Sequence, residues 1–192
     1  MITAIILAAG ESKRMGQPKM LMPWGKSTVL QTVISTVQAA GVADILVVTG
    51  GSRQQIEMLI GRSVQTVLNE EYEKGEMLSS IQVGLKAKMR EASAALICLG
   101  DQPQVKERSV RRVCDTFLAS KSNIVVPSYE MHRGHPWLIA RSLWDELLAM
   151  KSPQTPRDFL KKHARKVNYV EVDTPSILED IDTPEDYLKF KS

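Results

Sequence analysis

Short runs of apolar, often β-branched residues alternate with longer stretches of helical periodicity along almost the whole chain. Runs of four to six such residues between helices are typical of a mainly parallel sheet whose two faces are both covered. The pattern predicts strands over 2–7, 45–49, 64–68, 94–99, 124–127 and 167–172. It predicts helices over 28–40, 53–60, 79–89, 107–119, 143–150, 156–163 and 184–191. We therefore expect a three-layer α/β fold with ligand sites at the carboxyl ends of the strands.

Length and composition indicate an ordinary globular protein. A chain of 192 residues with 43% apolar and 24% charged residues is expected to form a single domain over 1–192. A net charge of +3 is too small to predict nucleic-acid binding. The spacing of Cys98 and Cys114 fits neither a zinc site nor a redox motif. The apolar stretch 2–9 is too short for a secretory signal, and no apolar run approaches the roughly 20 residues of a membrane span. We expect a cytoplasmic protein that binds no membrane.

The segment after the first predicted strand has the composition of a phosphate site. Residues 7–19 place Gly10, Arg14, Gly16 and Lys19 in one loop. Glycines let the backbone approach a phosphate, and successive N–H groups form a nest for the anion. An arginine can bind phosphate oxygens in a bidentate manner, while a lysine acts as a point charge. The spacing excludes a Walker A loop and the G-x-G-x-x-G dinucleotide fingerprint. A solvated loop without a ligand is the alternative.

The pattern L-A-A-G-x-S-x-R-M-G-x-x-K over 7–19 resembles the signature of nucleotidyltransferases related to the molybdenum-cofactor cytidylyl- and guanylyltransferases. The resemblance continues through Leu-Met-Pro-Trp-Gly at 21–25 and spans nearly the whole chain. It implies a Rossmann-like nucleotidyltransferase fold with a mainly parallel mixed sheet. The N-terminal part would bind the nucleotide, and roughly 120–192 would bind the acceptor and complete a metal site. The nucleotide-binding residues that it implies in the loop are Leu7, Ala8, Ala9, Gly10, Arg14, Gly16 and Lys19.

Two aspartates are candidates for a magnesium site. Asp101 follows a predicted buried strand in a Gly-Asp-Gln-Pro segment, which resembles the metal motif of the same family. Mg²⁺ takes one or two carboxylates and fills its remaining positions with phosphate oxygens and water; an aspartate that caps a turn is the alternative. The resemblance assigns the second carboxylate to Asp182, before Thr-Pro-Glu-Asp at 183–186, with Asp180 as the weaker candidate. Asp182 or Thr183 can also cap the last helix.

Two further segments resemble parts of this family. Ser79 and Ser80 follow Gly-Glu-Met-Leu near a predicted helix start, where hydroxyl groups can hold a base or ribose. A serine-capped helix is the alternative. Gly134 and His135 belong to a Gly-His-Pro element that implies acceptor binding, with a buried structural histidine as the alternative. Trp137 stands where the family has a small aliphatic residue, which leaves the choice of acceptor open.

The resemblance implies metal-dependent nucleotidyl transfer. An acceptor phosphate is already ionised, so the enzyme has to supply alignment and charge neutralisation rather than a nucleophile of its own. We expect Arg14, Lys19 and Asp101 to be catalytic. Asp101 would also contact the nucleotide and would share Mg²⁺ with Asp182.

The expected substrates are CTP and a molybdopterin-type acceptor, with pyrophosphate as by-product. Relatives that use CTP carry Leu-Ala-Ala-Gly, as this chain does, whereas the guanylyltransferases carry Leu-Ala-Gly-Gly. The methyl group of Ala9 leaves less room for a purine. One alternative is a cytidylyltransferase for a small phosphorylated alcohol or sugar. Another is a non-catalytic carrier of molybdenum cofactor; in either molybdenum reading, a molybdoenzyme would be the recipient.

Overall fold

The computed structural model describes residues 1–74, 76–120 and 122–191, so Gly75 of the Gly-Glu-Met-Leu segment lies outside the described residues. The strands are β1 (Ile2–Ala8), β2 (Pro23–Trp24), β3 (Ser27–Thr28), β4 (Asp44–Thr49), β5 (Gln65–Leu68), β6 (Ala94–Leu99), β7 (Ile124–Tyr129), β8 (His132–Arg133), β9 (Trp137–Ala140) and β10 (Val167–Glu171). The α-helices are α1 (Val29–Ala39), α2 (Arg53–Ile60), α3 (Met77–Lys88), α4 (Glu107–Ala119), α5 (Trp144–Ala149), α6 (Pro156–Lys162) and α7 (Pro184–Lys191).

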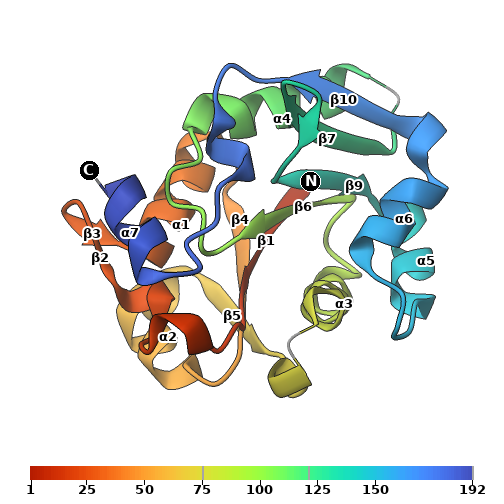
Figure 1. Cartoon of the computed structure of the whole chain (residues 1–192). Helices are drawn as coiled ribbons and strands as arrows, with labels where there is room; N and C mark the ends of the chain where they lie inside the picture. The colour runs from red at the N-terminus through yellow and green to blue at the C-terminus, as the bar shows by residue number, and fades with distance from the viewer. Residues whose placement is uncertain (75, 121, 192) are drawn as a thin grey trace.

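The main sheet is mixed but mostly parallel. Its strand order is β10-β7-β9-β6-β1-β4-β5, with β8 paired to β7 (Figure 1). Strand β1 is central and pairs in parallel with β4 and β6, and β5 and β10 extend the parallel arrangement at the two edges. Strand β9 runs antiparallel to β6 and β7. The predicted α/β class is confirmed, and β9 lies in a segment for which the sequence predicted neither helix nor strand.

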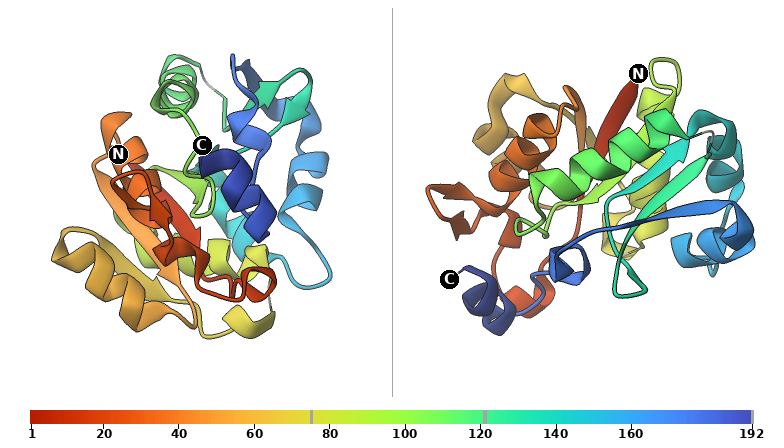
Figure 2. Two further views of the ribbon diagram at one scale, coloured as in Figure 1. Left: turned by 60° about the vertical axis from the view of Figure 1, so that its left-hand side comes forward. Right: turned by 90° about the horizontal axis from the view of Figure 1, so that it is seen from above.

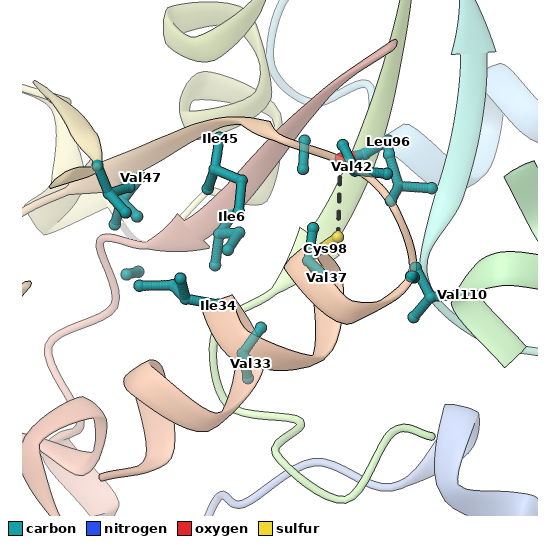
Figure 3. Close-up of a cluster of buried hydrophobic side chains, with 14 of the residues drawn as sticks. Ile6, Val33, Ile34, Val37, Val42, Ile45, Val47, Leu96, Cys98 and Val110 are labelled. Carbon is teal, nitrogen blue, oxygen red and sulfur yellow. Dashed lines mark hydrogen bonds between the residues drawn. The ribbon is translucent and has the colours of Figure 1, made fainter. Parts of the chain in front are cut away.

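Helices cover both faces of this sheet (Figure 1). Along β1, Ala4 and Ile6 belong to the cluster that packs under α1, α2 and α4, whereas Ile5 and Leu7 belong to the cluster under α3, α5 and α6. This alternation follows from the period of two along a strand. Figure 3 shows the first cluster, in which Val33 of α1 and its neighbours meet the apolar side chains of β4 and β6. The three predicted layers are therefore present.

The C-terminal segment returns to the N-terminal loop. A third apolar cluster joins Met15 and Met22 of that loop to Ile181 and Tyr187 near the other end of the chain. The Tyr187 hydroxyl donates a hydrogen bond to the backbone carbonyl of Pro23. Figure 2 shows α7, at the blue end of the colour range, beside the red N-terminal loop. Residues far apart in sequence therefore meet at the carboxyl end of β1.

Within the described ranges, each helix is too short or too polar to cross a bilayer.

Candidate active site

The loop after β1 is closed by its own backbone and side chains. Two short 3-10 helices, η1 (Lys13–Met15) and η2 (Lys19–Leu21), give it shape. Between them Gly16 has φ +68°, a left-handed conformation that glycine adopts without steric penalty. The Ser12 hydroxyl accepts a hydrogen bond from the Lys19 backbone N–H at 3.1 Å. The loop thereby turns the Lys19 side chain back under the chain, and this residue is only 8% exposed.

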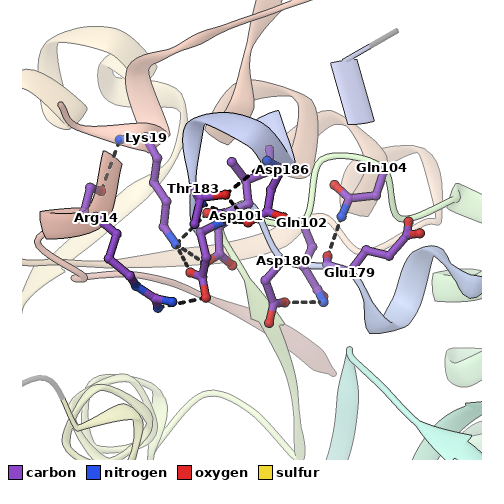
Figure 4. Close-up of polar contacts among 12 residues, drawn as sticks. Arg14, Lys19, Asp101, Gln102, Gln104, Glu179, Asp180, Thr183 and Asp186 are labelled. Carbon is purple, nitrogen blue, oxygen red and sulfur yellow. Dashed lines mark hydrogen bonds and ion pairs between the residues drawn. The ribbon is translucent and has the colours of Figure 1, made fainter. Parts of the chain in front are cut away.

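The Lys19 ammonium lies at the centre of a polar cluster. Its Nζ donates to Asp101 Oδ2 at 2.5 Å, to Asp182 Oδ1 at 3.1 Å and to the Ile181 carbonyl at 2.9 Å (Figure 4). Burial acts to lower the pKa of Lys19, but the two carboxylates outweigh it, and the net pKa lies above its ordinary value. The side chain is therefore charged at neutral pH, and its three donors are all used.

Arg14 extends this cluster toward solvent. Its Nη2 donates to Asp182 Oδ2 at 2.9 Å, so one carboxylate joins the two cations of the loop (Figure 4). The Arg14 side chain is 70% exposed, and the pair with Asp182 is accordingly weak in water. Arg14 is thus free to exchange its partner at little cost in stability.

Asp101 is placed by the end of β6. The Gly100 N–H donates to the Leu7 carbonyl at 3.0 Å, and a Cβ added at Gly100 would lie 2.8 Å from that oxygen. Only glycine allows this close approach of the two strands. The Ile181 N–H then donates to the Asp101 carbonyl at 3.1 Å, which fixes the C-terminal segment against the same point.

Thr183, and not Asp182, caps the start of α7. Thr183 Oγ1 accepts the Asp186 backbone N–H at 3.2 Å, while Asp186 Oδ2 accepts the Thr183 N–H at 2.9 Å. This reciprocal pattern is a capping box at the start of α7. Because Thr183 and Asp186 satisfy the helix terminus, the Asp182 carboxylate can face Lys19 and Arg14.

A cavity of about 350 Å³ opens beside this cluster. The predicted site residues that line it are Leu7, Ala9, Gly10, Arg14, Lys19, Ser80, Asp101 and Asp182, and Asp180, the weaker candidate, lines it too. Three other predicted nucleotide-binding residues do not line it. Ala8 packs into the core under α1, Gly16 ends η1, and the Ser79 hydroxyl donates to the Glu76 carbonyl at 2.9 Å. Nucleotide binding by these three residues stays a prediction.

A second and larger cavity, of about 690 Å³, adjoins the first. Gly134 and His135 line it, together with Trp137 and Arg157. Four residues line both cavities: Glu76, Met77, Leu99 and Asp180.

His135 is held rigidly in the wall of the second cavity. Its ring stacks on Trp137 with centroids 4.5 Å apart, and Trp137 Nε1 donates to the Gly134 carbonyl at 2.7 Å. His135 Nε2 is buried without a hydrogen-bond partner in the described part of the chain. Burial, and then the charge of Arg157, lower the pKa of His135 to about 3, so the imidazole is neutral at physiological pH. A buried, unpartnered ring nitrogen is suited to a polar ligand group.

The two cavities follow one edge of the sheet. Asn69 and Gly50 come after β5 and β4, Gly10 comes after β1, and Asp101 comes after β6. These strands are parallel neighbours, so the four residues lie along the carboxyl edge in the order of the strands. Trp137 begins antiparallel β9 opposite Ile97, near the same end of β6. The charged cluster therefore lines the smaller cavity at the ends of β1 and β6, with Tyr72 on its β5 side, and the larger cavity continues toward β9.

Asp101 and Asp182 fit a metal ion whose remaining ligands come from a bound phosphate and water. No group of three or more His, Cys, Asp or Glu side chains able to hold a metal ion occurs within the described ranges. Asp101 and Asp182 nevertheless direct oxygens at one point, where the Lys19 ammonium now lies between them. Two carboxylates with phosphate oxygens and water are a suitable donor set for Mg²⁺. The residues present fit such an ion only in company with a phosphate ligand.

Gln102, Asn69 and Tyr72 were not predicted from the sequence, whereas Asp180 was the weaker candidate for the second carboxylate. Gln102 Nε2 donates to Asp180 Oδ1 at 2.8 Å and so orients a carboxylate that lines both cavities. Partial burial, and then the charge of Asp101, raise the pKa of Asp180 to about 6. Tyr72 lines the smaller cavity from the β5 side, and Asn69 begins the same connection after β5. An asparagine directly after a strand was the available signal for Asn69.

Residues 4–167 match the MobA-like NTP transferase domain. The chain belongs to this family. It is therefore a nucleotidyltransferase, with a nucleoside triphosphate and a phosphorylated acceptor as its class of substrates. Asp180 and Asp182 lie beyond the matched residues.

Individual relatives span the whole chain. The chain is 29% identical to molybdenum cofactor cytidylyltransferase of Escherichia coli over 99% of its length and 95% of the relative. It is 28% identical to nicotine blue oxidoreductase of Paenarthrobacter nicotinovorans, covering 98% of this chain and 96% of that one. The crystal structure of Rv0371c from Mycobacterium tuberculosis has a TM-score of 0.87 at 28% identity, with 99% and 97% covered. A second structure of Rv0371c is a complex with manganese, with a TM-score of 0.79. A divalent metal accordingly suits this family.

Proposed function

We propose that this protein transfers CMP from CTP to the phosphate of molybdopterin or of molybdenum cofactor and releases pyrophosphate. The observation that carries this proposal is the cluster of Lys19, Asp101 and Asp182 beside the shared wall of two cavities. A nucleotidyl transfer needs this arrangement, because triphosphate and acceptor phosphate must meet in line at one charged point. The relative from Escherichia coli supports the choice of acceptor.

In the proposed reaction, an oxygen of the acceptor phosphate attacks the α-phosphorus of CTP. The bond between that phosphorus and the oxygen bridging to the β-phosphate breaks, and pyrophosphate leaves with the electron pair. Lys19 and Arg14 exchange their carboxylate partners for triphosphate oxygens and stabilise the charge on the leaving group. Asp101 and Asp182 would hold Mg²⁺, which supplies further neutralisation of phosphate charge when bound. Gly10 would let the backbone approach the phosphates, and Ser80, which lines the same cavity, would contact the ribose or base.

The preference for CTP rests on Ala9. Ala9 is 6% exposed and lines the smaller cavity, which would hold the nucleotide and is called the nucleotide cavity below. Its carbonyl lies close to Gly50. In this proposal the methyl group takes space that a larger purine would need. Replacing Ala9 with glycine is expected to increase turnover with GTP relative to CTP.

The acceptor would occupy the larger cavity. His135 lines this cavity, its buried Nε2 has no partner within the described residues, and Gly134 brings the backbone close to the Ile177 carbonyl. A pterin carries several ring nitrogens and an amino group, which suit hydrogen bonds to a neutral imidazole. The shared wall at Asp180 and Leu99 would then bring the acceptor phosphate toward the triphosphate.

The test is release of pyrophosphate with CTP, GTP, ATP or UTP, each with Mg²⁺ and with molybdopterin or molybdenum cofactor. We expect turnover to be highest with CTP and to require the cofactor. Preference for GTP would overturn the choice of base. Turnover with a small sugar or alcohol phosphate but not with cofactor would favour the alternative cytidylyltransferase. Tight binding of cofactor without pyrophosphate release would favour a carrier.

A further inference from the structure

Among the described residues that line the nucleotide cavity, Tyr72 is the only one with an aromatic side chain. It lies in the 3-10 helix η4 (Tyr72–Lys74), which follows β5. Strand β5 is separated from β6 by β4 and β1, and adjacent strands lie about 4.8 Å apart. Three such spacings put the β5 end of the edge roughly 14 Å from the end of β6, which carries Asp101. Tyr72 therefore lies on the side of the cavity away from the metal carboxylates.

The ring of Tyr72 packs across Gly50 and Gly51. A Cβ added at Gly50 would lie 2.8 Å from Tyr72 Cβ and 2.9 Å from its Cγ. A Cβ added at Gly51 would lie 3.0 Å from Cε2 and 3.3 Å from Cζ. The two glycines thus form a flat backbone surface for the ring, and the same Gly50 Cβ would clash with the Ala9 carbonyl at 2.3 Å. This contact ties the ring to the residue on which the choice of base rests.

A buried asparagine fixes the connection that carries Tyr72. Asn69 is 1% exposed, and its Nδ2 donates to the hydroxyls of Ser79 and Ser80 at 3.0 Å each. Its backbone N–H donates to the Thr49 carbonyl at 2.9 Å, and its own carbonyl accepts the Tyr72 N–H at 3.3 Å. The connection after β5 is therefore held both to β4 and to the start of α3, so the ring needs little ordering when a ligand arrives.

We propose that the ring of Tyr72 stacks on the nucleobase of the bound nucleoside triphosphate. The inference rests on the proposed triphosphate site: with the phosphates at Lys19 and Arg14, the base extends over β4 and β5 toward the ring. Stacking accepts every base, because each has a π-face. Tyr72 would thus supply affinity for the nucleoside, while the space left by Ala9 decides between pyrimidine and purine. Asn69 is a positioning residue for the ring and for Ser80.

The experiment compares wild type with Tyr72→Phe and Tyr72→Leu by calorimetric titration without acceptor. The probes are inorganic tripolyphosphate and whichever of CTP, GTP, ATP or UTP wild type binds most tightly, each with Mg²⁺. Loss of one base–aromatic stack weakens binding about fivefold or more. We expect Tyr72→Leu to weaken nucleotide binding at least about fivefold, with less than a twofold change for Tyr72→Phe. Tripolyphosphate binding should change less than twofold in both variants.

Three results would overturn the inference. Unchanged nucleotide affinity in Tyr72→Leu would show that the ring does not touch the base. Equal weakening in Tyr72→Phe would assign the effect to the hydroxyl, which donates to Glu73 at 3.2 Å. Equal loss of nucleotide and tripolyphosphate would indicate distortion of the phosphate loop. Since the titrations contain no acceptor, absence of pyrophosphate release with molybdenum cofactor would overturn the proposed function alone.

Discussion

Replacing Lys19 with methionine removes one charge and keeps most of the side-chain volume. The ammonium donates to two carboxylates and a backbone carbonyl, and its side chain is 10% exposed. In Lys19→Met, Asp101 and Asp182 would face each other without the cation that now separates them. The substitution should therefore change stability, metal binding and catalysis, each for the same electrostatic reason.

Removing one partner of a fully buried ion pair costs about 3 to 5 kcal/mol. The carboxylates here keep solvent access, with side chains 18% exposed at Asp101 and 35% at Asp182. Water can therefore stabilise part of the unpaired charge, and we expect a loss of about 2 kcal/mol in unfolding free energy at pH 7. Loss of one electrostatic contact in the transition state should lower turnover by about 100-fold or more. Vacating the point between the carboxylates should strengthen Mg²⁺ binding in the absence of nucleotide.

The assay is urea unfolding followed by tryptophan fluorescence, with and without Mg²⁺, beside pyrophosphate release at saturating CTP. Magnesium should restore more stability to Lys19→Met than to wild type. Lys26→Met is the matched control, because Lys26 is an exposed lysine in the same N-terminal region. If Lys19→Met unfolds like Lys26→Met and keeps near-wild-type turnover, the charged cluster does not have the role assigned to it.

Four further predictions concern the same edge of the sheet. Asp101→Asn should lower pyrophosphate release by about 100-fold at saturating Mg²⁺, and near-wild-type turnover would contradict its place at the metal. Gly134→Ala should destabilise the fold by about 3 kcal/mol in thermal or urea unfolding, because the new Cβ would lie 2.1 Å from the Ile177 carbonyl. In Gly10→Ala, where no atom lies within 4 Å of the Cβ, stability should stay unchanged while nucleotide binding weakens. The pKa of Asp180 is raised to about 6, so the folded state favours its protonated carboxyl over the ionised one. The protonated carboxyl therefore contributes stability at low pH, and this contribution is lost as pH rises from about 4 through 6. Asp180→Asn should therefore raise the unfolding free energy by about 1 kcal/mol at pH 8, because solvent access weakens the effect, and leave it little changed at pH 4; a gain that is equal at both pH values would refute this reading.

The fold was largely predictable because the periodicity of apolar residues along a helix or strand indicates which face is buried. The helix over 107–119 and the strand over 94–99 have the predicted bounds. Strand β9 was missed for a physical reason. Its residues Trp137, Leu138 and Ile139 are buried between β6 and β7, so both faces are apolar and no alternation remains. Four apolar residues after a proline could equally begin a helix.

The loop over 7–19 could be proposed as a phosphate site from the sequence because its residues are contiguous. Its partners could not be found in this way, since Lys19 meets Asp182 across 163 positions. That pairing depends on where β6 ends and on how the C-terminal segment returns. Tyr72 was missed for the same reason: its significance lies in contact with Gly50 and Gly51, which belong to the connection after a different strand. Family resemblance supplied Asp182, while spacing alone offered only a helix cap.

The position of Asp182 connects the phosphate loop to the last helix. Its carboxylate binds Lys19 and Arg14, while Thr183 and Asp186 beside it begin α7. Helix α7 in turn packs through Tyr187 in one apolar cluster with Met15 of the loop. If nucleotide draws Lys19 and Arg14 away from Asp182, the polar half of this connection is lost while the apolar half remains. A metal shared with Asp101 would restore a cation between the carboxylates, so the loop and α7 would stay joined through the reaction. The segment after residue 167 therefore belongs to the site as much as the loop does.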